Sequence, residues 1–275
     1  TASSFVAQDN TMDDTLFDDL TPSQTVTTLS GTQHTLATEI PLAITINGVN
    51  HVVMMVSPYQ LDAFIIGFLL TEGIITHHRD IHDLEFEHQQ KAIIAHATLA
   101  NRCHQPWLAK KRNLAGRTGC GLCGIESLAA AFPSLPPLAA SALPSTQALM
   151  SLREQLPQWQ VLNRDCGALH AAFFADDQGQ ILHASEDVGR HNALDKLLGW
   201  HHQQPPLPKG MILVTSRCSI ELIFKMVRTH NATLVTLSSP TQLAVEQARH
   251  YRLNLIHIPY QQQPRVYAGT DISSV

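Results

Sequence analysis

The second half of the chain alternates short apolar stretches with helix-like ones, and this alternation limits the folds open to it. Three apolar runs are predicted as buried strands, at 211–215, 232–237 and 253–258. Apolar residues at helical spacing predict helices between them, at 220–230 and 241–252. Strands that alternate with helices of this length favour an α/β fold whose sheet contains parallel strands.

The complete predicted order in this half is α-β-β-α-β-α-β-α-β, which begins with a helix at 145–156 and strands at 168–175 and 180–185. The cytidine-deaminase-like three-layer α/β/α sandwich has this order, and it is the fold predicted here. A zinc deaminase needs His-x-Glu at its second helix and Pro-Cys-x-x-Cys at its third. Those places carry Glu186–His191 and Ser216–Ser219, so the sequence argues against deamination.

The first half is predicted as a smaller, β-rich subdomain. Strands at 40–47 and 49–56 flank the hairpin signal Asn47-Gly48, and Ser57-Pro58 indicates the start of the next helix. Three segments are therefore predicted: a flexible acidic tail (1–35), an α+β subdomain that ends in a Cys-x-x-Cys loop (115–125) and a Pro-rich linker (36–143), and a cytidine-deaminase-like α/β domain (144–275).

Composition narrows the class of protein. A net charge of −5 argues against nucleic-acid binding. No apolar run approaches the ~18 residues of a membrane-spanning helix, so no membrane partner is expected. The acidic N-terminus lacks the features of a signal peptide, which makes a cytoplasmic location the expectation. Five cysteines without an export signal do not indicate a disulfide framework.

Two of these cysteines, Cys120 and Cys123, lie in the glycine-rich stretch Ala115–Gly124. The Cys-x-x-Cys spacing occurs in zinc sites, in dithiol redox centres and around one reactive thiol with a helper. A zinc site needs four ligands, and a second pair could come only from another copy of the chain, so no metal site is assigned. Glycines favour a nucleophile that must meet a donor and an acceptor, because they let the backbone move and a bulky partner approach. Two unreactive thiols remain the plain alternative.

Cations precede the cysteine pair. Lys111, Arg112 and Arg117 would favour the reactive thiolate form of a nearby cysteine, as would a helix that begins near Gly124. For any one of these cations, a solvated basic face is the alternative interpretation.

A second motif, Glu186–Lys196, lies at a predicted strand-to-helix junction, where ligands bind in open α/β sheets. Free backbone N–H groups at such a junction attract phosphate. We expect Arg190, with His191 beside it, to bind phosphate, and Asp187 or Glu186 to bind a guanine edge. The alternative is that Asp187 caps the helix and Arg190 pairs with a carboxylate.

A third motif, Thr215–Ser219, follows the next predicted strand and also precedes a helix. Ser216, Arg217 and Ser219 are suited to holding phosphate at the N-terminus of that helix. Cys218 is expected to be a small core residue.

The stretch Ala115–Gly124 and the motif Glu186–Lys196 together resemble the formate dehydrogenase accessory sulfurtransferases, the FdhD family. The likeness extends over about residues 40–267 and includes Thr71–Ile75 and Leu243–Glu246. The combination of motifs is specific, whereas a Cys-x-x-Cys alone would not be.

The resemblance implies a sulfurtransferase with a cysteine persulfide intermediate. Members of the family take persulfide sulfur from a cysteine desulfurase and deliver it to the molybdenum bis-molybdopterin guanine dinucleotide cofactor of formate dehydrogenase. The cofactor is cargo, and no tightly bound metal of the protein's own is implied. The family fold is cytidine-deaminase-like and its members are usually homodimers. By resemblance, Cys120 is the persulfide carrier and Cys123 assists the transfer or relays the sulfur.

The resemblance also implies a cofactor-binding segment after the last predicted strand. Family members usually carry a glycine and basic residues there, whereas the nearest cation in this chain is Arg265, which is expected to substitute. The segment consists of Ile258, Pro259, Tyr260, Gln261, Gln262 and Gln263.

Two other functions stay open at this point. A chaperone that binds the guanine-containing cofactor without chemistry would not need Cys120. A thiol-disulfide redox protein would form a stable Cys120–Cys123 disulfide. The sequence identifies neither the client formate dehydrogenase nor the residues that contact guanine.

Overall fold

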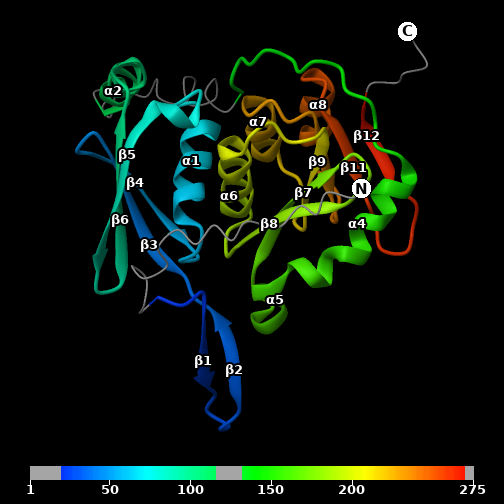
Figure 1. The fold of residues 1–275 in the computed structure, drawn as a ribbon, viewed down its shortest axis with the longest axis horizontal. Helices are drawn as coiled ribbons and strands as arrows, with labels where there is room; N and C mark the ends of the chain where they lie inside the picture. Colours follow the sequence, from blue (N-terminus) through cyan, green and yellow to red (C-terminus); the bar gives the residue numbers. More distant parts are fainter. Residues whose placement is uncertain (1–19, 116–131, 270–275) are drawn as a thin grey trace, which may run out of the picture.

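The computed structural model describes residues 20–115 and 132–269, with side chains for 20–109 and 132–269 (Figure 1). Its strands form three sheets: a two-stranded sheet β1-β2, a four-stranded sheet in the order β4-β3-β6-β5, and a six-stranded sheet in the order β12-β11-β10-β9-β7-β8. The last sheet carries most of the residues that the sequence singled out.

The four-stranded sheet contains the strands β3 (Ile40–Ile46), β4 (Val49–Val56), β5 (Ile81–Gln89) and β6 (Ala92–Leu99). The predicted turn at Asn47-Gly48 is confirmed, because both residues have positive φ, 46° and 77°, as a tight hairpin turn requires. Apolar residues of β3 and β6 pack on helix α1 (Leu61–Thr71). The short helix η2 (His78–Asp80) precedes β5, and helix α2 (Asn101–Ala115) follows β6.

The predicted start of α1 at Ser57-Pro58 is wrong. The helix begins at Leu61, after Gln60, whose φ of 50° is left-handed. Ser57 does not cap α1 because it is bound elsewhere: its N–H donates to the Asp187 carboxylate, and its hydroxyl accepts from the Val188 N–H.

The six-stranded sheet is the middle of three layers. Helices α6 (Arg190–Gln203), α7 (Ile220–Arg228) and α8 (Gln242–His250) share one core with one face of the sheet. Helix α4 (Thr146–Trp159) covers the other face. The short helix α5 (Val161–Cys166) leads from α4 into the sheet. The strands are β7 (His170–Asp176), β8 (Ile181–Asp187), β9 (Gly210–Val214), β10 (Thr233–Thr236), β11 (Asn254–His257) and β12 (Arg265–Ala268).

The predicted α/β class is confirmed. Strands β9, β10 and β11 are parallel, as their alternation with α7 and α8 predicts. Strand β7 is antiparallel to both β8 and β9, and β12 is antiparallel to β11. The more specific assignment to the cytidine-deaminase fold stays a prediction, as does the domain boundary at residues 143 and 144.

Several elements differ from expectation. Strands β1 (Ser23–Thr27) and β2 (Gln33–Ala37) lie within the stretch 1–35 and just beyond it, where a flexible tail was expected. Strand β1 contains two threonines and a valine, residues of high β-propensity whose signal the polar composition of the segment obscured. Helices α2 and α5 and strand β12 were also not expected.

The two larger sheets are joined through close packing of α1 against α6 (Figure 1). A Cβ added at Gly67 of α1 would lie 1.7 Å from the carbonyl oxygen of Asp195, and one at Gly199 of α6 would lie 1.9 Å from that of Ala63. Glycine is therefore required at both positions. Among the described residues, no helix is long and apolar enough to cross a membrane.

Candidate functional site

The predicted cofactor-binding residues gather at one edge of the six-stranded sheet. Because β7 is antiparallel to β8 and to β9, strand β8 runs in the same direction as β9, β10 and β11. The carboxyl ends of these four strands therefore lie along one edge, here called the carboxyl edge. The first residues of β7 also lie there, because Ala171 N donates to Thr215 Oγ1.

The carboxyl edge receives every candidate cofactor-binding residue. Asp187 ends β8, and Arg190 and His191 begin α6; Ser216 and Arg217 follow β9; Ile258, Pro259, Tyr260, Gln261, Gln262 and Gln263 follow β11, and Arg265 begins β12. Residues from three separate motifs thus lie along the same edge of the sheet, although no ligand contact is established for any of them.

Asp187 is fully buried and engaged by the protein itself. One carboxylate oxygen lies 2.7 Å from Lys196 Nζ and 3.0 Å from the Ser57 N–H donor. The other accepts from the Gly189 N–H at 2.8 Å and from Asn192 Nδ2 at 2.9 Å. Asp187 therefore fixes the turn that leads into α6, and its oxygens are occupied by protein donors.

Lys196 is buried beside this carboxylate. Burial lowers the pKa of its ammonium group, and the neighbouring Asp187 opposes that shift. Its Nζ also donates to the carbonyl oxygens of Ser57 and Glu186, at 3.1 and 3.3 Å. The pair thus ties the end of β4 to the start of α6.

Glu186 faces helix α5. Its two carboxylate oxygens accept from the N–H groups of Leu162 and Asn163, each at 2.9 Å. Burial raises the pKa of this carboxyl. The side chain is used in holding the first turn of α5 against the end of β8.

Two helix N-termini at the carboxyl edge lack a side-chain cap. Helix α6 follows Gly189 and helix α7 follows Ser219, and neither residue makes a side-chain hydrogen bond to the first turn. In contrast, α8 is capped by Thr241, whose hydroxyl accepts from the Ala244 N–H. Helix α6 has no acidic residue in its first turn, so its uncapped N–H groups and the helix dipole favour an anion in front of it. Helix α7 carries Glu221 in its first turn, and this carboxylate already occupies that helix end.

Cationic and neutral donors adjoin these helix ends. The Arg190 Nε and the His191 Nε2 are buried without a hydrogen-bond partner among the described residues. Burial lowers the pKa of His191, and the nearby Arg190 and Lys225 lower it further, so the ring is expected to be neutral at pH 7. Arg217 is exposed, and Ser216 is buried behind it.

The segment after β11 forms a second part of the site. Gln261 has a φ of 54°, the left-handed conformation that a glycine adopts without strain. Tyr260 is 71% exposed. Arg265 donates to the Gln262 side chain. The turn thus keeps a glycine-type geometry although the sequence lacks the glycine.

A cation from α4 approaches this segment, and sequence reasoning missed it. Arg153 Nη2 donates to the Ile258 carbonyl oxygen at 2.6 Å. Its guanidinium carbon lies 5.6 Å from the centre of the Tyr260 ring, within the range of a cation–π contact. No local motif marks Arg153, because it lies far along the chain from the turn that it supports.

The predicted catalytic pair, Cys120 and Cys123, lies outside the described residues, as does Arg117. Cys218 is buried in the core, as expected, and burial raises the pKa of its thiol to about 12. Among the described residues, no group of His, Cys, Asp and Glu side chains could hold a metal ion.

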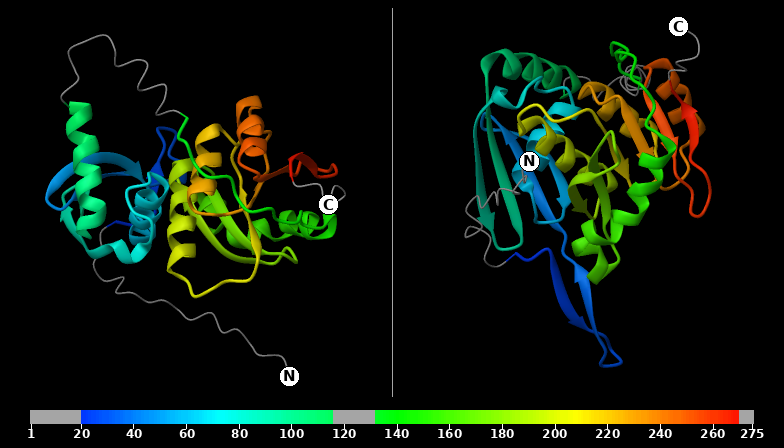
Figure 2. Two further views of the ribbon diagram at one scale, coloured as in Figure 1. Left: turned by 90° about the horizontal axis from the view of Figure 1, so that it is seen from above. Right: turned by 45° about the vertical axis from the view of Figure 1, so that its right-hand side comes forward.

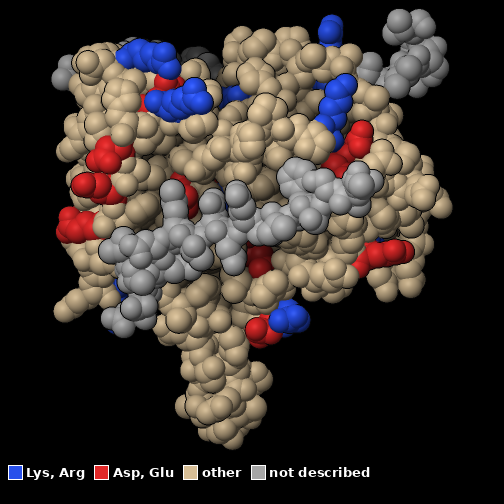
Figure 3. Space-filling view, in the orientation of Figure 1, with Lys and Arg blue, Asp and Glu red and all other residues tan. Residues whose placement is uncertain are grey.

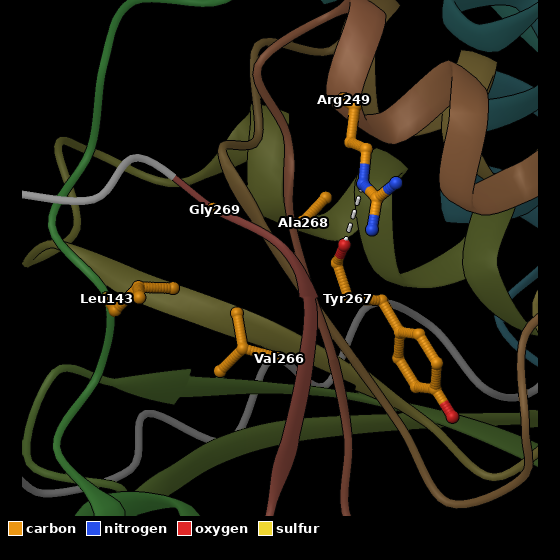
Figure 4. A pocket seen from close by; sticks show the side chains of 6 residues that line it. All are labelled: Leu143, Arg249, Val266, Tyr267, Ala268 and Gly269. Atoms are coloured by element: carbon orange, nitrogen blue, oxygen red, sulfur yellow. Dashed lines mark hydrogen bonds between the residues drawn. The ribbon is translucent and has the colours of Figure 1, made fainter.

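An open pocket of about 480 Å³ lies beside strand β12 (Figure 4). Leu143, Val266 and Ala268 give it an apolar floor, and Arg249 Nε donates to the Tyr267 carbonyl oxygen at 3.0 Å. None of the candidate residues lines this pocket.

Comparison with known proteins confirms the resemblance inferred from the motifs. A family model described as the FdhD/NarQ family matches residues 37–272. A sulfur carrier protein FdhD from Bordetella bronchiseptica is 40% identical over 230 residues, which cover 82% of this chain and 83% of that protein. A sulfur carrier protein FdhD from Burkholderia mallei is 39% identical over 231 residues, which cover 79% of this chain and 82% of that protein.

The fold also has a counterpart among solved structures. The crystal structure of a candidate formate dehydrogenase accessory protein from Desulfotalea psychrophila is similar with a TM-score of 0.65 and 22% identity, over 90% of this chain and 96% of that one. At this identity the likeness concerns the fold. Since the family model spans most of the sequence and the relatives match over a similar extent, the chain belongs to the FdhD/NarQ family.

Proposed function

We propose that this protein is a sulfur carrier in the maturation of formate dehydrogenase, with Cys120 as the residue that holds the sulfur. The observation that supports this most is the 40% identity to a protein named as a sulfur carrier, over 82% of the chain. Its partners would be a cysteine desulfurase, the formate dehydrogenase and a second copy of the chain, and it would act in the cytoplasm.

The loading step requires only thiol chemistry. The Cys120 thiolate attacks the outer sulfur of the desulfurase persulfide, a sulfur–sulfur bond forms, and the desulfurase cysteine leaves as a thiolate. No net oxidation occurs, because the sulfane sulfur moves from one cysteine to another.

The release step assigns a role to Cys123. Attack of its thiolate on Cys120 Sγ releases hydrosulfide to the acceptor and leaves a Cys120–Cys123 disulfide. Two electrons move from the two thiols to the transferred sulfur, so a thiol reductant must reduce the pair before the next cycle.

The carboxyl edge is the proposed site for the molybdenum bis-molybdopterin guanine dinucleotide cargo. The uncapped start of α6 supports phosphate binding there, together with Arg190 and Arg217. The exposed Tyr260 ring offers a stacking surface for a purine base, and the Arg153 guanidinium lies close to that ring. The cargo brings its own metal.

The test is to incubate the purified protein with a cysteine desulfurase and cysteine, and to weigh it intact. The proposal predicts a gain of about 32 Da, the mass of one sulfur atom, which is lost on reduction. Cys120→Ala should gain nothing, whereas Cys166→Ala, a control at a half-buried cysteine, should load normally. Equal loading of Cys120→Ala would contradict the role of Cys120.

The uncapped start of α6 favours a second candidate, a cofactor-binding chaperone without sulfur chemistry. It predicts that GDP binds equally to the wild type and to Cys120→Ala while neither protein gains sulfur from an active desulfurase.

A further inference from the structure

The turn between β11 and β12, here called the Tyr260 turn (residues 258–264), lies beside helix α4 in the views of Figures 1 and 2. Its backbone is strained, because Gln261 adopts a φ of 54° although it is not a glycine. A residue in this conformation persists only where its surroundings hold it, and such residues gather at ligand-binding turns. The contacts that hold the Tyr260 turn therefore bear on its purpose.

The Tyr260 turn is anchored on both sides by arginines. On one side, Arg153 Nη2 donates to the Ile258 carbonyl oxygen at 2.6 Å. On the other, Arg265 at the start of β12 donates to the Gln262 side chain. Arg153 belongs to α4, whose leucines are buried against the sheet. The first anchor thus comes from a helix that is fixed in the core.

Arg153 also contacts the ring of Tyr260. Its guanidinium carbon lies over the ring, 5.6 Å from the ring centre, and a cation in this position attracts the ring face. Arg153 is half-buried and Tyr260 is 71% exposed, so one face of the ring meets the protein and the other meets solvent. Within the part of the chain that the structure describes, no carboxylate forms an ion pair with Arg153. Its charge is therefore available to the ring.

The surroundings of the exposed ring suit a base better than a phosphate. The sequence has no Asp, Glu, Lys or Arg between His257 and Arg265, and three exposed glutamines follow Tyr260. Figure 3 shows mainly uncharged side chains on this side of the molecule, with isolated charges of both signs. Glutamine amides donate and accept hydrogen bonds, as the edges of a base require, whereas a phosphate favours cations.

We propose that Arg153 is a positioning residue for a base platform. It holds the Tyr260 ring from the protein side, so that a purine base stacks on the solvent face of the ring. The phosphates of the same nucleotide then lie toward Arg190 and Arg217. This inference rests on the proposed function, which supplies a guanine nucleotide as cargo, and it adds the division of the carboxyl edge into a base part and a phosphate part.

Calorimetric titration of the full chain with GDP and with pyrophosphate tests the division. Tyr260→Ala and Arg153→Gln should each weaken GDP binding by roughly 10-fold, the effect of losing one stacked base. Neither variant should change the binding of pyrophosphate, which has no base. Tyr260→Phe keeps the ring and should bind GDP as the wild type does. An equal loss of GDP and pyrophosphate binding in Arg153→Gln would overturn the proposal, because it would make Arg153 a phosphate ligand.

A double variant separates positioning from direct contact with the base. If Arg153 acts only through the ring, Arg153→Gln should have no further effect on GDP binding in the Tyr260→Ala background. A second loss of roughly 10-fold in that background would contradict the positioning role. Arg249→Gln is the matched control, because Arg249 is also a helix arginine that donates to a backbone carbonyl oxygen, and it should bind GDP normally.

The exposed Tyr260 keeps the test valid if Arg153→Gln does not fold, because Tyr260→Ala removes only a side chain in solvent. A wild type that does not bind GDP, or Tyr260→Ala that binds GDP as tightly as the wild type, would overturn the platform. Sulfur loading of Cys120 by a cysteine desulfurase needs neither Arg153 nor Tyr260, so it decides separately whether the protein is a sulfur carrier.

Discussion

Two regions of the molecule differ in whether their buried charged and polar groups have partners: the contact between α1 and α6, and the carboxyl edge of the sheet. At the helix contact, the buried Asp195 carboxylate is bound by Lys225 Nζ at 2.8 Å and by the Thr71 hydroxyl at 2.8 Å. At the carboxyl edge, the Arg190 Nε and the His191 Nε2 are buried without partners among the described residues. Complete pairing makes the first region a rigid joint, whereas the second has donors left for a ligand.

The largest predicted effect lies in the joint. Gly67→Ala and Gly199→Ala should each prevent stable folding, because the new methyl group would lie about 2 Å from a backbone carbonyl oxygen in a helix that cannot shift. Yield and circular dichroism measure the loss. Gly31→Ala is the control, because its added methyl has open space and only the positive φ is unfavourable, at about 1 kcal/mol. Normal folding of either helix variant would show that the contact is looser than described.

The next largest effect comes from breaking a buried pair. Lys196→Met leaves the Asp187 carboxylate buried with no counter-charge, which should cost about 3–5 kcal/mol of unfolding free energy. The double variant with Asp187→Asn should recover part of that loss, because it removes the uncompensated charge. Urea unfolding measures both. Additive losses in the double variant would show that the two groups are not coupled.

The third prediction concerns acid. Burial lowers the pKa of His183 and of His201 from 6.5 to about 4. Between pH 4 and pH 6.5 the unfolded chain binds more protons than the folded one. The contribution of the two neutral rings to the free energy of unfolding is therefore full above pH 6.5 and is lost as the pH falls through about 4. Each ring contributes on the order of 3 kcal/mol to this loss.

Unfolding by urea at several pH values tests the acid prediction. His201→Phe should flatten the fall in stability between neutral pH and pH 4, since it removes one titrating ring. The exposed His34 offers the control, and His34→Phe should leave the profile unchanged. A wild-type stability that is constant over this range would contradict the expected titration.

The smallest effect on stability is predicted at the carboxyl edge. Arg190→Gln and Arg217→Gln should fold normally and weaken GDP binding by roughly 10-fold each, the loss of one charge-assisted contact. Arg249→Gln, beside the pocket at β12, is the matched control and should bind as the wild type does. Calorimetric titration with GDP measures all three. Unchanged GDP binding in both Arg190→Gln and Arg217→Gln would show that the nucleotide does not bind at the carboxyl edge.

Local patterns explain how much of the fold the sequence predicted. The alternation of strands and helices was predicted because each element has its own periodicity of apolar residues. The turn at Asn47-Gly48 was predicted because Asn and Gly readily adopt the positive φ that a tight hairpin turn requires. The start of α1 was misplaced because Ser57 is bound by a residue 130 positions away. Arg153 was missed for a similar reason, since its partner Ile258 lies 105 positions along the chain.

In the candidate site, too, local patterns predicted some features, whereas others depend on contacts between residues far apart in the sequence. Strand-to-helix junctions placed Arg190 and Ser216 at one edge, because parallel strands end together. The interpretation of Asp187 and Glu186 as guanine ligands stays a prediction, and the structure shows both carboxylates engaged by protein donors. Burial and partners of a carboxylate depend on tertiary contacts that no local pattern contains.

The most direct test follows the sulfur itself. The protein is loaded with radiolabelled sulfur from a desulfurase, freed of the donor, and mixed with molybdenum bis-molybdopterin guanine dinucleotide. If the protein is a sulfur carrier that binds its cargo at the carboxyl edge, the label moves from Cys120 to the cofactor, and the Arg190→Gln/Arg217→Gln double variant loads normally but transfers slowly. Label that leaves as free sulfide without reaching the cofactor, or equal transfer by the double variant, would contradict it.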